Sequence, residues 1–290
     1  MRQFLRQQPP QCGVDACLPA RRVRRTACLH APGAQVGFLL RGGCQARSAG
    51  VLRPAPAPAG RAPLPPVRLE IRDRLDHVVA VRDEQEWPLA RTEWRRLFLG
   101  EGGTLAENES GAGSVGFDLR RDAAVFDHRF DEDTEVSGPM TLSLRVATTG
   151  STDPRLFVAI EKWSDNAPVP FEGSYGYGRD RVAQGRLRLA LRELDPVLST
   201  PHQPEHTFRT LQPVRDGEEV EVLIPLSSSA TRFRAGDSLR LMVAGRYPQP
   251  RNPFFGHFPT HYLPTTSGKA VIAWSPGRPS ALEIPVVPQG

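Results

Sequence analysis

The stretch Met140-Thr141-Leu142-Ser143-Leu144-Arg145-Val146 alternates apolar and polar residues along its whole length. Successive side chains of a β-strand point to opposite faces of a sheet, so this pattern places the four apolar residues on one face. The segment therefore predicts a strand with one buried face.

Comparable segments recur up to residue 287, and Gly, Pro, Asn and Asp punctuate nearly all of them. No long amphipathic helix separates these segments, which argues against a parallel sheet because parallel strands need crossover connections. The sequence therefore predicts an all-β, antiparallel sandwich, with loops at 164–184, 193–217 and 246–266 packed over it. The further expected strands are 67–71, 95–99, 123–130, 156–163, 185–191, 219–225, 238–244, 269–274 and 282–287.

Residues 1–66 differ in composition from the rest of the chain. They are dense in Arg, Pro, Gly and Ala, and they end in two proline-rich runs. Such a segment buries too little apolar surface to offset its chain entropy, so we expect disorder there. We therefore divide the chain into a disordered segment, 1–66, and a domain, 67–290. The abrupt change at Val67 also fits a truncated or mis-framed start for the first segment.

The charge is divided unevenly along the chain. The net charge is +5, but residues 1–66 hold ten arginines and one acid, hence +9, which leaves −4 for residues 67–290. A mildly acidic domain does not favour a nucleic-acid partner. No apolar run approaches the roughly 20 residues that span a bilayer, and no secretory signal is recognisable, so we expect a cytoplasmic protein without a membrane partner.

All four cysteines, Cys12, Cys17, Cys28 and Cys44, precede the predicted domain. Their spacing does not match the C-x2-C pairs of zinc ribbons, so we expect free thiols there. We expect no metal and no cofactor in the chain.

Five regions stand out by their order and spacing along the chain. The first combines PPVRLE at 65–70 with EWPLART at 86–92. The others are FDEDTEVSGPM at 130–140, DPRLFVAI at 153–160, residues 185–200, and FRAGDSLRL at 233–241. Ser137-Gly138-Pro139 and residues 234–237 within them have the composition of turns. Together the five regions resemble the C-terminal domain of the CocE/NonD hydrolases, the cocaine-esterase and X-prolyl dipeptidyl-peptidase group, in which the region at 130–140 is similar to a hairpin.

This resemblance implies a galactose-binding-like jelly-roll domain that accompanies an α/β-hydrolase domain, supplied in cis or in trans. In that family the catalytic Ser, Asp and His lie on the preceding hydrolase domain, for which residues 1–66 are too short. No catalytic residue is therefore transferable, and we expect the chain to be inactive alone. Two other hypotheses remain open: a stand-alone carbohydrate-binding module and one half of a split hydrolase. The oligomeric state is also open, including a homo-oligomer.

Three motifs invite a catalytic or metal-binding interpretation. Residues 112–116, AGSVG, approach a nucleophile elbow around Ser114, but we expect a glycine-rich loop between strands.

Two pairs of histidines, His202/His206 and His257/His261, each flank a proline, and we expect loop histidines that cap turns or pack against aromatic rings. The acidic residues between 127 and 135 are expected to form a solvated hairpin turn rather than a Ca²⁺ site; these are Asp127, Asp131, Glu132, Asp133 and Glu135.

Aromatic residues in the loops supply the last candidates. Trp163 and Trp274 are expected to pack in the core or under loops. An apolar patch is expected where a hydrolase domain docks, because a face that is buried between domains keeps its aromatic side chains. The candidate docking residues are Tyr175, Tyr177, Phe254, Phe255 and Phe258.

Overall fold

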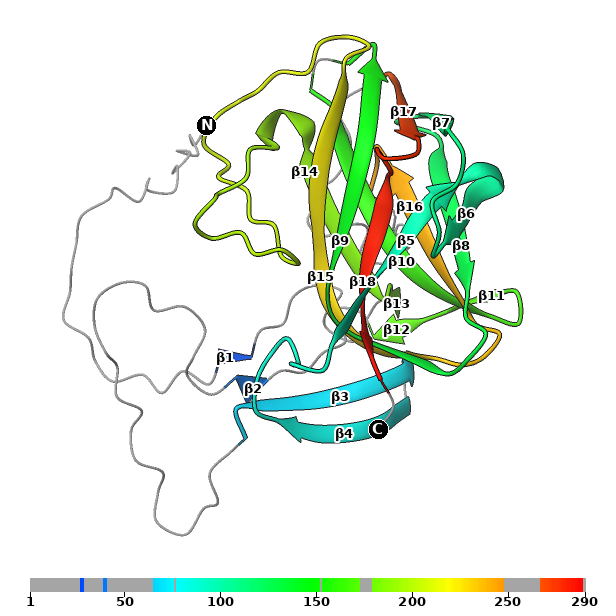
Figure 1. Ribbon diagram of the computed structural model, residues 1–290, viewed down its shortest axis with the longest axis vertical. Coiled ribbons are helices and arrows are strands. Elements are labelled where there is room, and N and C mark those ends of the chain that lie inside the picture. Colours follow the sequence, from blue (N-terminus) through cyan, green and yellow to red (C-terminus); the bar gives the residue numbers. More distant parts are fainter. Residues whose placement is uncertain are drawn as a thin grey trace, which may run out of the picture.

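The computed structural model describes residues 65–75, 77–151, 153–172, 179–247 and 267–288, together with two short backbone strands nearer the N-terminus (Figure 1). These two strands, β1 (Ala27–Cys28) and β2 (Leu39–Leu40), pair with each other in antiparallel orientation. The domain between Val67 and Val287 contains all the other strands.

Strand β9 (Thr134–Thr149) is the centre of the first layer of the sandwich. It pairs along one edge with β15 (Glu219–Phe233), to which it is antiparallel. Its other edge pairs first with β18 (Ala281–Val287) and then with β17 (Lys269–Trp274). This strand therefore has hydrogen-bonded neighbours along nearly its whole length, and the alternation in its sequence determines which of its faces is apolar.

The remaining strands of this layer extend it on both sides. Strand β18 pairs with β5 (Glu93–Gly100), which is followed by β6 (Thr104–Ala106), and β17 pairs with β7 (Gly113–Asp118). On the opposite side, a hairpin of β3 (Val67–Arg74) and β4 (His77–Glu84) joins β15 through the parallel pair Arg72 and Thr231. Figure 1 shows this hairpin across one end of the sandwich.

The second layer runs in the order β14 (Ala183–Arg188), β10 (Arg155–Ser164), β16 (Ser238–Ala244) and β8 (Ala123–Arg129). Single residue pairs connect the two layers, Gly185 with Leu226 at one side and Thr104 with Asp127 at the other. The short elements that complete the described chain are β11 (Ala167–Val169), β12 (Phe171–Glu172), β13 (Arg179–Asp180) and the 3₁₀ helices η1 (Glu101–Gly103) and η3 (Leu189–Leu191).

The core lies between the layers. Leu142 and Leu144 of β9 face the centre together with Val158 and Ile160 of β10, and all four are fully buried. A second, smaller core under the hairpin contains Val67, Leu69, Ile71, Leu89, Ala230 and Val287. The predicted all-β sandwich is therefore confirmed, whereas its finer assignment as a galactose-binding-like jelly roll stays a prediction. Within the described residues, no helix has the length and apolarity needed to cross a membrane.

Each predicted strand is present, but three local predictions were wrong. The strand expected over 185–191 ends at Arg188, and its last residues form η3. The expected hairpin at 130–140 connects β8 and β9, which lie in different layers. The expected turn at Ser137-Gly138-Pro139 lies inside β9.

Gly138 is required where β9 passes under Pro285. Both neighbouring ladders shift register beside it, between Leu226 and Ser229 on β15 and between Glu283 and Val286 on β18. Gly138 has a φ of 155°, and a Cβ at this position would lie 2.7 Å from Cβ of Pro285. Only glycine allows both the backbone conformation and the close approach.

We expect Gly138→Ala to lower the free energy of unfolding by about 3 kcal/mol, because the added methyl group must displace Pro285 or the strand. Urea denaturation measures this loss. Gly111→Ala is the control, because a Cβ there meets no atom within 4 Å. Similar stabilities for the two variants would contradict the assigned role of Gly138.

Candidate interdomain interface

The five predicted docking residues, Tyr175, Tyr177, Phe254, Phe255 and Phe258, lie outside the described residues. The structure therefore does not test them. A different loop, residues 193–211, projects from the sandwich between η3 and β15 (Figure 1). We call it the projecting loop, and its contacts define the surface described below.

The projecting loop is held by hydrogen bonds within itself. The Asp195 carboxylate accepts hydrogen bonds from the backbone N–H groups of Val197 and Leu198 at 2.9 and 3.1 Å, which lower the pKa of this carboxyl. The Asp195 N–H donates to the carbonyl of Glu205 at 2.7 Å, and the Ser199 hydroxyl bridges back to the backbone of Glu205. The loop therefore has a defined conformation without regular secondary structure.

His202 fastens the projecting loop to the outer face of the first layer. Its ring stacks on Trp94 of β5, with centroids 3.8 Å apart and planes 1° apart. Its Nδ1 lies 2.7 Å from a carboxylate oxygen of Glu283, while its carbonyl accepts a hydrogen bond from the Thr141 hydroxyl at 3.0 Å. Arg96 approaches the other oxygen of Glu283 at 3.5 Å. Three neighbouring strands thus hold one loop residue.

His206 is buried at the base of the projecting loop. Burial lowers the pKa of its imidazole, which a hydrogen bond to the backbone of Leu223 opposes. Its ring lies against Phe208, with centroids 5.6 Å apart. Both histidines of the first predicted pair therefore pack against aromatic rings, as expected, whereas His257 and His261 lie outside the described residues.

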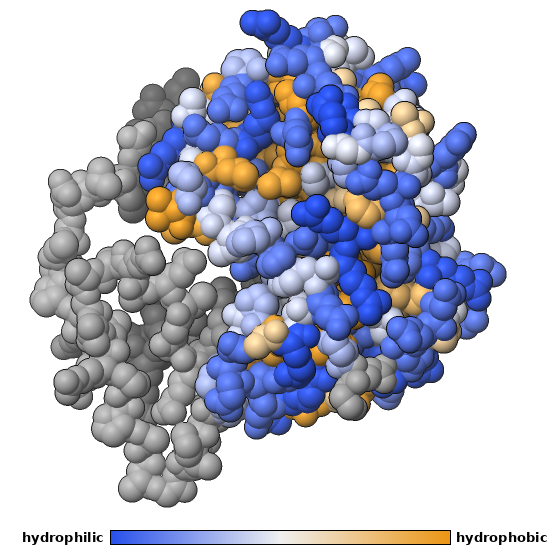
Figure 2. All heavy atoms as spheres, viewed as in Figure 1, coloured by the Kyte–Doolittle hydropathy of each residue, from blue (hydrophilic) through white to orange (hydrophobic). Residues whose placement is uncertain are grey.

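The projecting loop exposes a group of large apolar side chains, which we call the loop patch. It consists of Val197, Leu198, Phe208 and Leu211, which are 72%, 52%, 61% and 55% exposed. Phe208 also has a φ of 52°, a left-handed conformation that is unfavourable for a residue with a Cβ. Figure 2 shows hydrophobic surface over this loop at the upper left. The other exposed large apolar side chains in the described chain are valines on strands, at 78, 81, 125 and 271.

A buried lysine links the β3–β4 hairpin to both layers. Lys162 of β10 is only 3% exposed, and its ammonium lies 2.9 Å from the Asp237 carboxylate. It also donates to the carbonyls of Asp73 on β3 and Arg232 on β15, at 3.1 and 2.7 Å. Burial lowers the pKa of Lys162, and the hydrogen bond and charge of Asp237 oppose this effect.

The carboxylate of Asp73 completes this buried cluster. It is 2% exposed and lies 2.7 Å from both His77 and Arg234. Burial raises its pKa, but the hydrogen bond from His77 and the charges of His77, Lys162 and Arg234 outweigh this effect, so the net shift is downward. These groups satisfy one another, so the cluster is structural.

Asp131, Glu132 and Asp133 lie in an exposed turn between β8 and β9, as expected, but these strands do not form a hairpin with each other, and Asp127 and Glu135 lie on the strands themselves. Asp127 pairs with Arg240 at 2.7 Å, and Asp133 pairs with Arg232 at 2.7 Å. Glu135 is buried and accepts hydrogen bonds from Arg82 and Ser137. Asp127, Asp133 and Glu135 are therefore distributed among separate ion pairs, because the chain crosses between layers here.

The predicted loop around Ser114 is strand β7 instead. Gly113–Asp118 pairs with β17, and Ser114 lies exposed opposite Ala273. The strand is not followed by the helix that a nucleophile elbow needs. Gly113 and Gly116 therefore lie in a strand and not in a loop or an elbow, because this segment pairs with β17.

Trp274 packs in the core as predicted, whereas Trp163 is half-buried and packs against side chains of its own sheet. The Trp163 indole donates to Glu161 at 2.7 Å and lies under the Arg240 guanidinium, 3.8 Å from its ring centroid. Trp274 meets Phe126 edge-on in the core. Neither ring is presented as a free stacking platform.

A shallow cleft opens at one end of the sandwich, where β5 and β18 face β8. Leu97, Ile284 and Val286 form its apolar floor, and charged residues of both signs form its rim. Phe130 supplies the one phenyl ring among its described lining residues, but it is 5% exposed and packs against Phe233. His128 also lines the cleft, but it is half-buried and packs edge-on against Phe130, so the described lining residues present no fully exposed ring on which a sugar could stack.

The sandwich, with an ordered loop that exposes apolar side chains, has the form of an accessory domain. A family model described as "X-Pro dipeptidyl-peptidase C-terminal non-catalytic domain" matches residues 59–283. The chain belongs to this family. No match was found among curated proteins.

Solved structures that are similar to this chain support the family assignment. A CocE/NonD family hydrolase from Staphylococcus aureus is 31% identical, with a TM-score of 0.71, over 77% of this chain and 42% of its own. An aminopeptidase from a marine sediment Thaumarchaeota archaeon has a TM-score of 0.52 at 18% identity, over 72% of this chain and 39% of its own. An α-amino acid ester hydrolase has a TM-score of 0.50 at 18% identity, over 77% of this chain and 41% of its own. The last two share the fold, and this chain spans less than half the length of each hydrolase.

We expect Lys162→Met to destabilise the domain by roughly 3–5 kcal/mol, because it leaves Asp237 and two carbonyls buried without their donor. Lys269→Met is the matched control, since Lys269 is the only other lysine and is exposed; its effect should stay within about 0.5 kcal/mol. Chemical denaturation measures both. Equal stability of the two variants would show that the buried cluster does not hold the hairpin.

Proposed function

We propose that this chain acts as the accessory domain of a CocE/NonD-type serine hydrolase of the X-prolyl dipeptidyl-peptidase or acyl-esterase class. The match of residues 59–283 to a non-catalytic C-terminal domain carries this proposal. The Staphylococcus aureus hydrolase supports it, because this chain covers only 42% of that protein. We propose an α/β-hydrolase domain, supplied in cis or in trans, as the partner, because the resemblance to the CocE/NonD hydrolases implies one.

The described residues support a non-catalytic role. Ser114 lies on a strand, away from an elbow geometry, and His202 is engaged with Trp94 and Glu283. A serine hydrolase needs a nucleophile, a base within hydrogen-bond reach and donors for the oxyanion. The described part of the chain brings no such set together.

The alternative function, a stand-alone carbohydrate-binding module, has less support. Such a module needs exposed rings to stack on sugars, and the described residues of the cleft between β5, β18 and β8 offer only the buried ring of Phe130 and the half-buried imidazole of His128, which packs edge-on against Phe130. The second alternative, one half of a split hydrolase, differs from the leading proposal only because a separate chain would supply the catalytic domain.

We expect no serine of the purified chain to react with a fluorophosphonate probe, because the described residues bring together neither a triad nor an oxyanion hole. Mass spectrometry of the treated protein measures labelling, with an intact serine esterase as the positive control. Stoichiometric modification, at Ser114 first of all, would overturn the proposed non-catalytic role.

We also propose that the domain comprises residues 67–290 and that residues 1–66 contribute nothing to its stability. Strand β3 begins at Val67, and β1 and β2 form a separate two-stranded sheet, although β2 lies close to β3. Deletion of residues 1–66 should therefore leave the melting temperature within a few degrees of that of the full chain. A clear drop, measured by calorimetry, would show that the domain begins earlier.

A further inference from the structure

We propose that the loop patch, Val197, Leu198, Phe208 and Leu211, is the surface that docks onto the α/β-hydrolase domain. The inference rests on the proposed function and assigns the docking site to described residues of this chain. The expected occupant is an apolar surface of the hydrolase domain.

The first argument is that the patch is exposed on an ordered loop. Asp195 and Ser199 fix the loop by internal hydrogen bonds, and His202 fastens it to Trp94 and Glu283. The apolar side chains are therefore presented in one arrangement and are not collapsed against the sandwich. Preorganisation of this kind reduces the entropy lost when a partner covers the surface.

The second argument is the backbone of Phe208. Its left-handed conformation costs free energy, yet the residue remains 61% exposed and gains little burial in return. Asparagine or glycine would relieve the backbone strain at this position. A surface that keeps a strained, exposed phenylalanine is suited to burying that ring against a partner.

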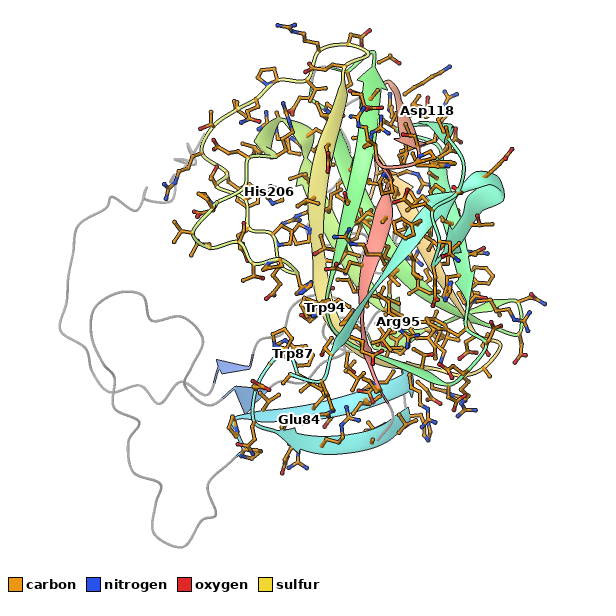
Figure 3. All side chains as sticks on the ribbon, in the orientation of Figure 1. Glu84, Trp87, Trp94, Arg95, Asp118 and His206 are labelled. Atoms are coloured by element: carbon orange, nitrogen blue, oxygen red, sulfur yellow. The ribbon has the colours of Figure 1, made fainter. Side chains whose placement is uncertain are left out.

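The third argument is the direction from which a catalytic domain joins. The matched family is a C-terminal domain, so its catalytic part precedes the sandwich, which begins at Val67 of β3. Figure 1 shows the start of β3 and the projecting loop on the same side of the sandwich, at the left. In the same view His206, Trp94 and Trp87 follow one another from the loop down toward the β3–β4 hairpin (Figure 3). A preceding domain can therefore contact the patch without passing around the sandwich.

The charges around the patch indicate the nature of the contact. Between residues 192 and 209, Glu193, Asp195 and Glu205 carry negative charge and Arg192 and Arg209 carry positive charge, which gives this segment a net charge of −1. A net charge this small does not favour a nucleic acid or another highly charged partner. An apolar centre with a mixed polar rim is typical of a protein interface.

The test compares amide hydrogen exchange in two proteins. One is the complete 290-residue chain; the other is the same chain fused behind the catalytic part of the Staphylococcus aureus hydrolase. We expect exchange within the projecting loop to slow by about tenfold or more in the fusion, because docking covers the loop and suppresses its opening. Exchange on β7 should not change.

A double variant that carries both Val197→Ser and Phe208→Asn sharpens the test. Asparagine tolerates the left-handed backbone, so the isolated chain should be as stable as the parent or more so. The fusion carrying the pair should lose the added protection of the loop. Val125→Ser with Val271→Ser is the matched control, because it removes exposed apolar residues from β8 and β17, and it should leave the protection unchanged.

Each other outcome decides against the proposal in a distinguishable way. Protection at another surface, with the loop unchanged, overturns the loop patch as the docking site and leaves the proposed function standing. Two domains that unfold independently, with protection nowhere, count against the proposed function and the docking site together. Loop protection that rises with concentration of the isolated chain would assign the patch to a second copy instead.

Discussion

Strand β9 is covered on both faces, and this constraint governs much of the surrounding structure. Its apolar face fills the core, so its polar side chains lie under other segments and each needs a partner there. Thr141 donates to the carbonyl of His202, and Arg145 contacts Glu219, Ser275 and the carbonyl of Arg278. The projecting loop and the turn before β18 are therefore parts of one polar layer over β9.

This polar layer explains why a segment without regular structure is ordered. Its contacts to Thr141, Trp94 and Glu283 come from three adjacent strands, whose spacing is fixed by their ladders. Once His202 is held, the internal turns of the loop set the positions of Val197 and Leu198. The exposed surface of the loop is thus positioned by the core strand beneath it.

Much of the fold could be predicted from alternation alone, because a half-buried strand imposes a period of two on its sequence. The prediction failed where tertiary pairing outweighs local preference. Ser137-Gly138-Pro139 has turn composition, but the glycine serves a close approach to Pro285 within β9. Strand β4 was missed because it lies at the edge and its exposure barely alternates.

The candidate interface was harder to predict. Aromatic content directed attention to Tyr175 and Phe254, whereas the described loop patch is mainly aliphatic and irregularly spaced. In sequence, Val197 and Leu198 cannot be distinguished from core residues, because only the three-dimensional path of the loop determines their exposure. A detectable signal was present in His202, which was predicted either to cap a turn or to pack against an aromatic ring, although its partner Trp94 lies over 100 residues away in sequence.

The two lysines give this protein an uncommon chemical property. Lys269 is exposed, whereas Lys162 is enclosed by Asp237 and two carbonyls. An amine-reactive reagent therefore meets one accessible ε-amino group in the folded chain, besides the α-amino group, and a second becomes available only when the strands separate. Lysine labelling thus provides both a single attachment site and, through Lys162, an intrinsic reporter of the opening of the sandwich.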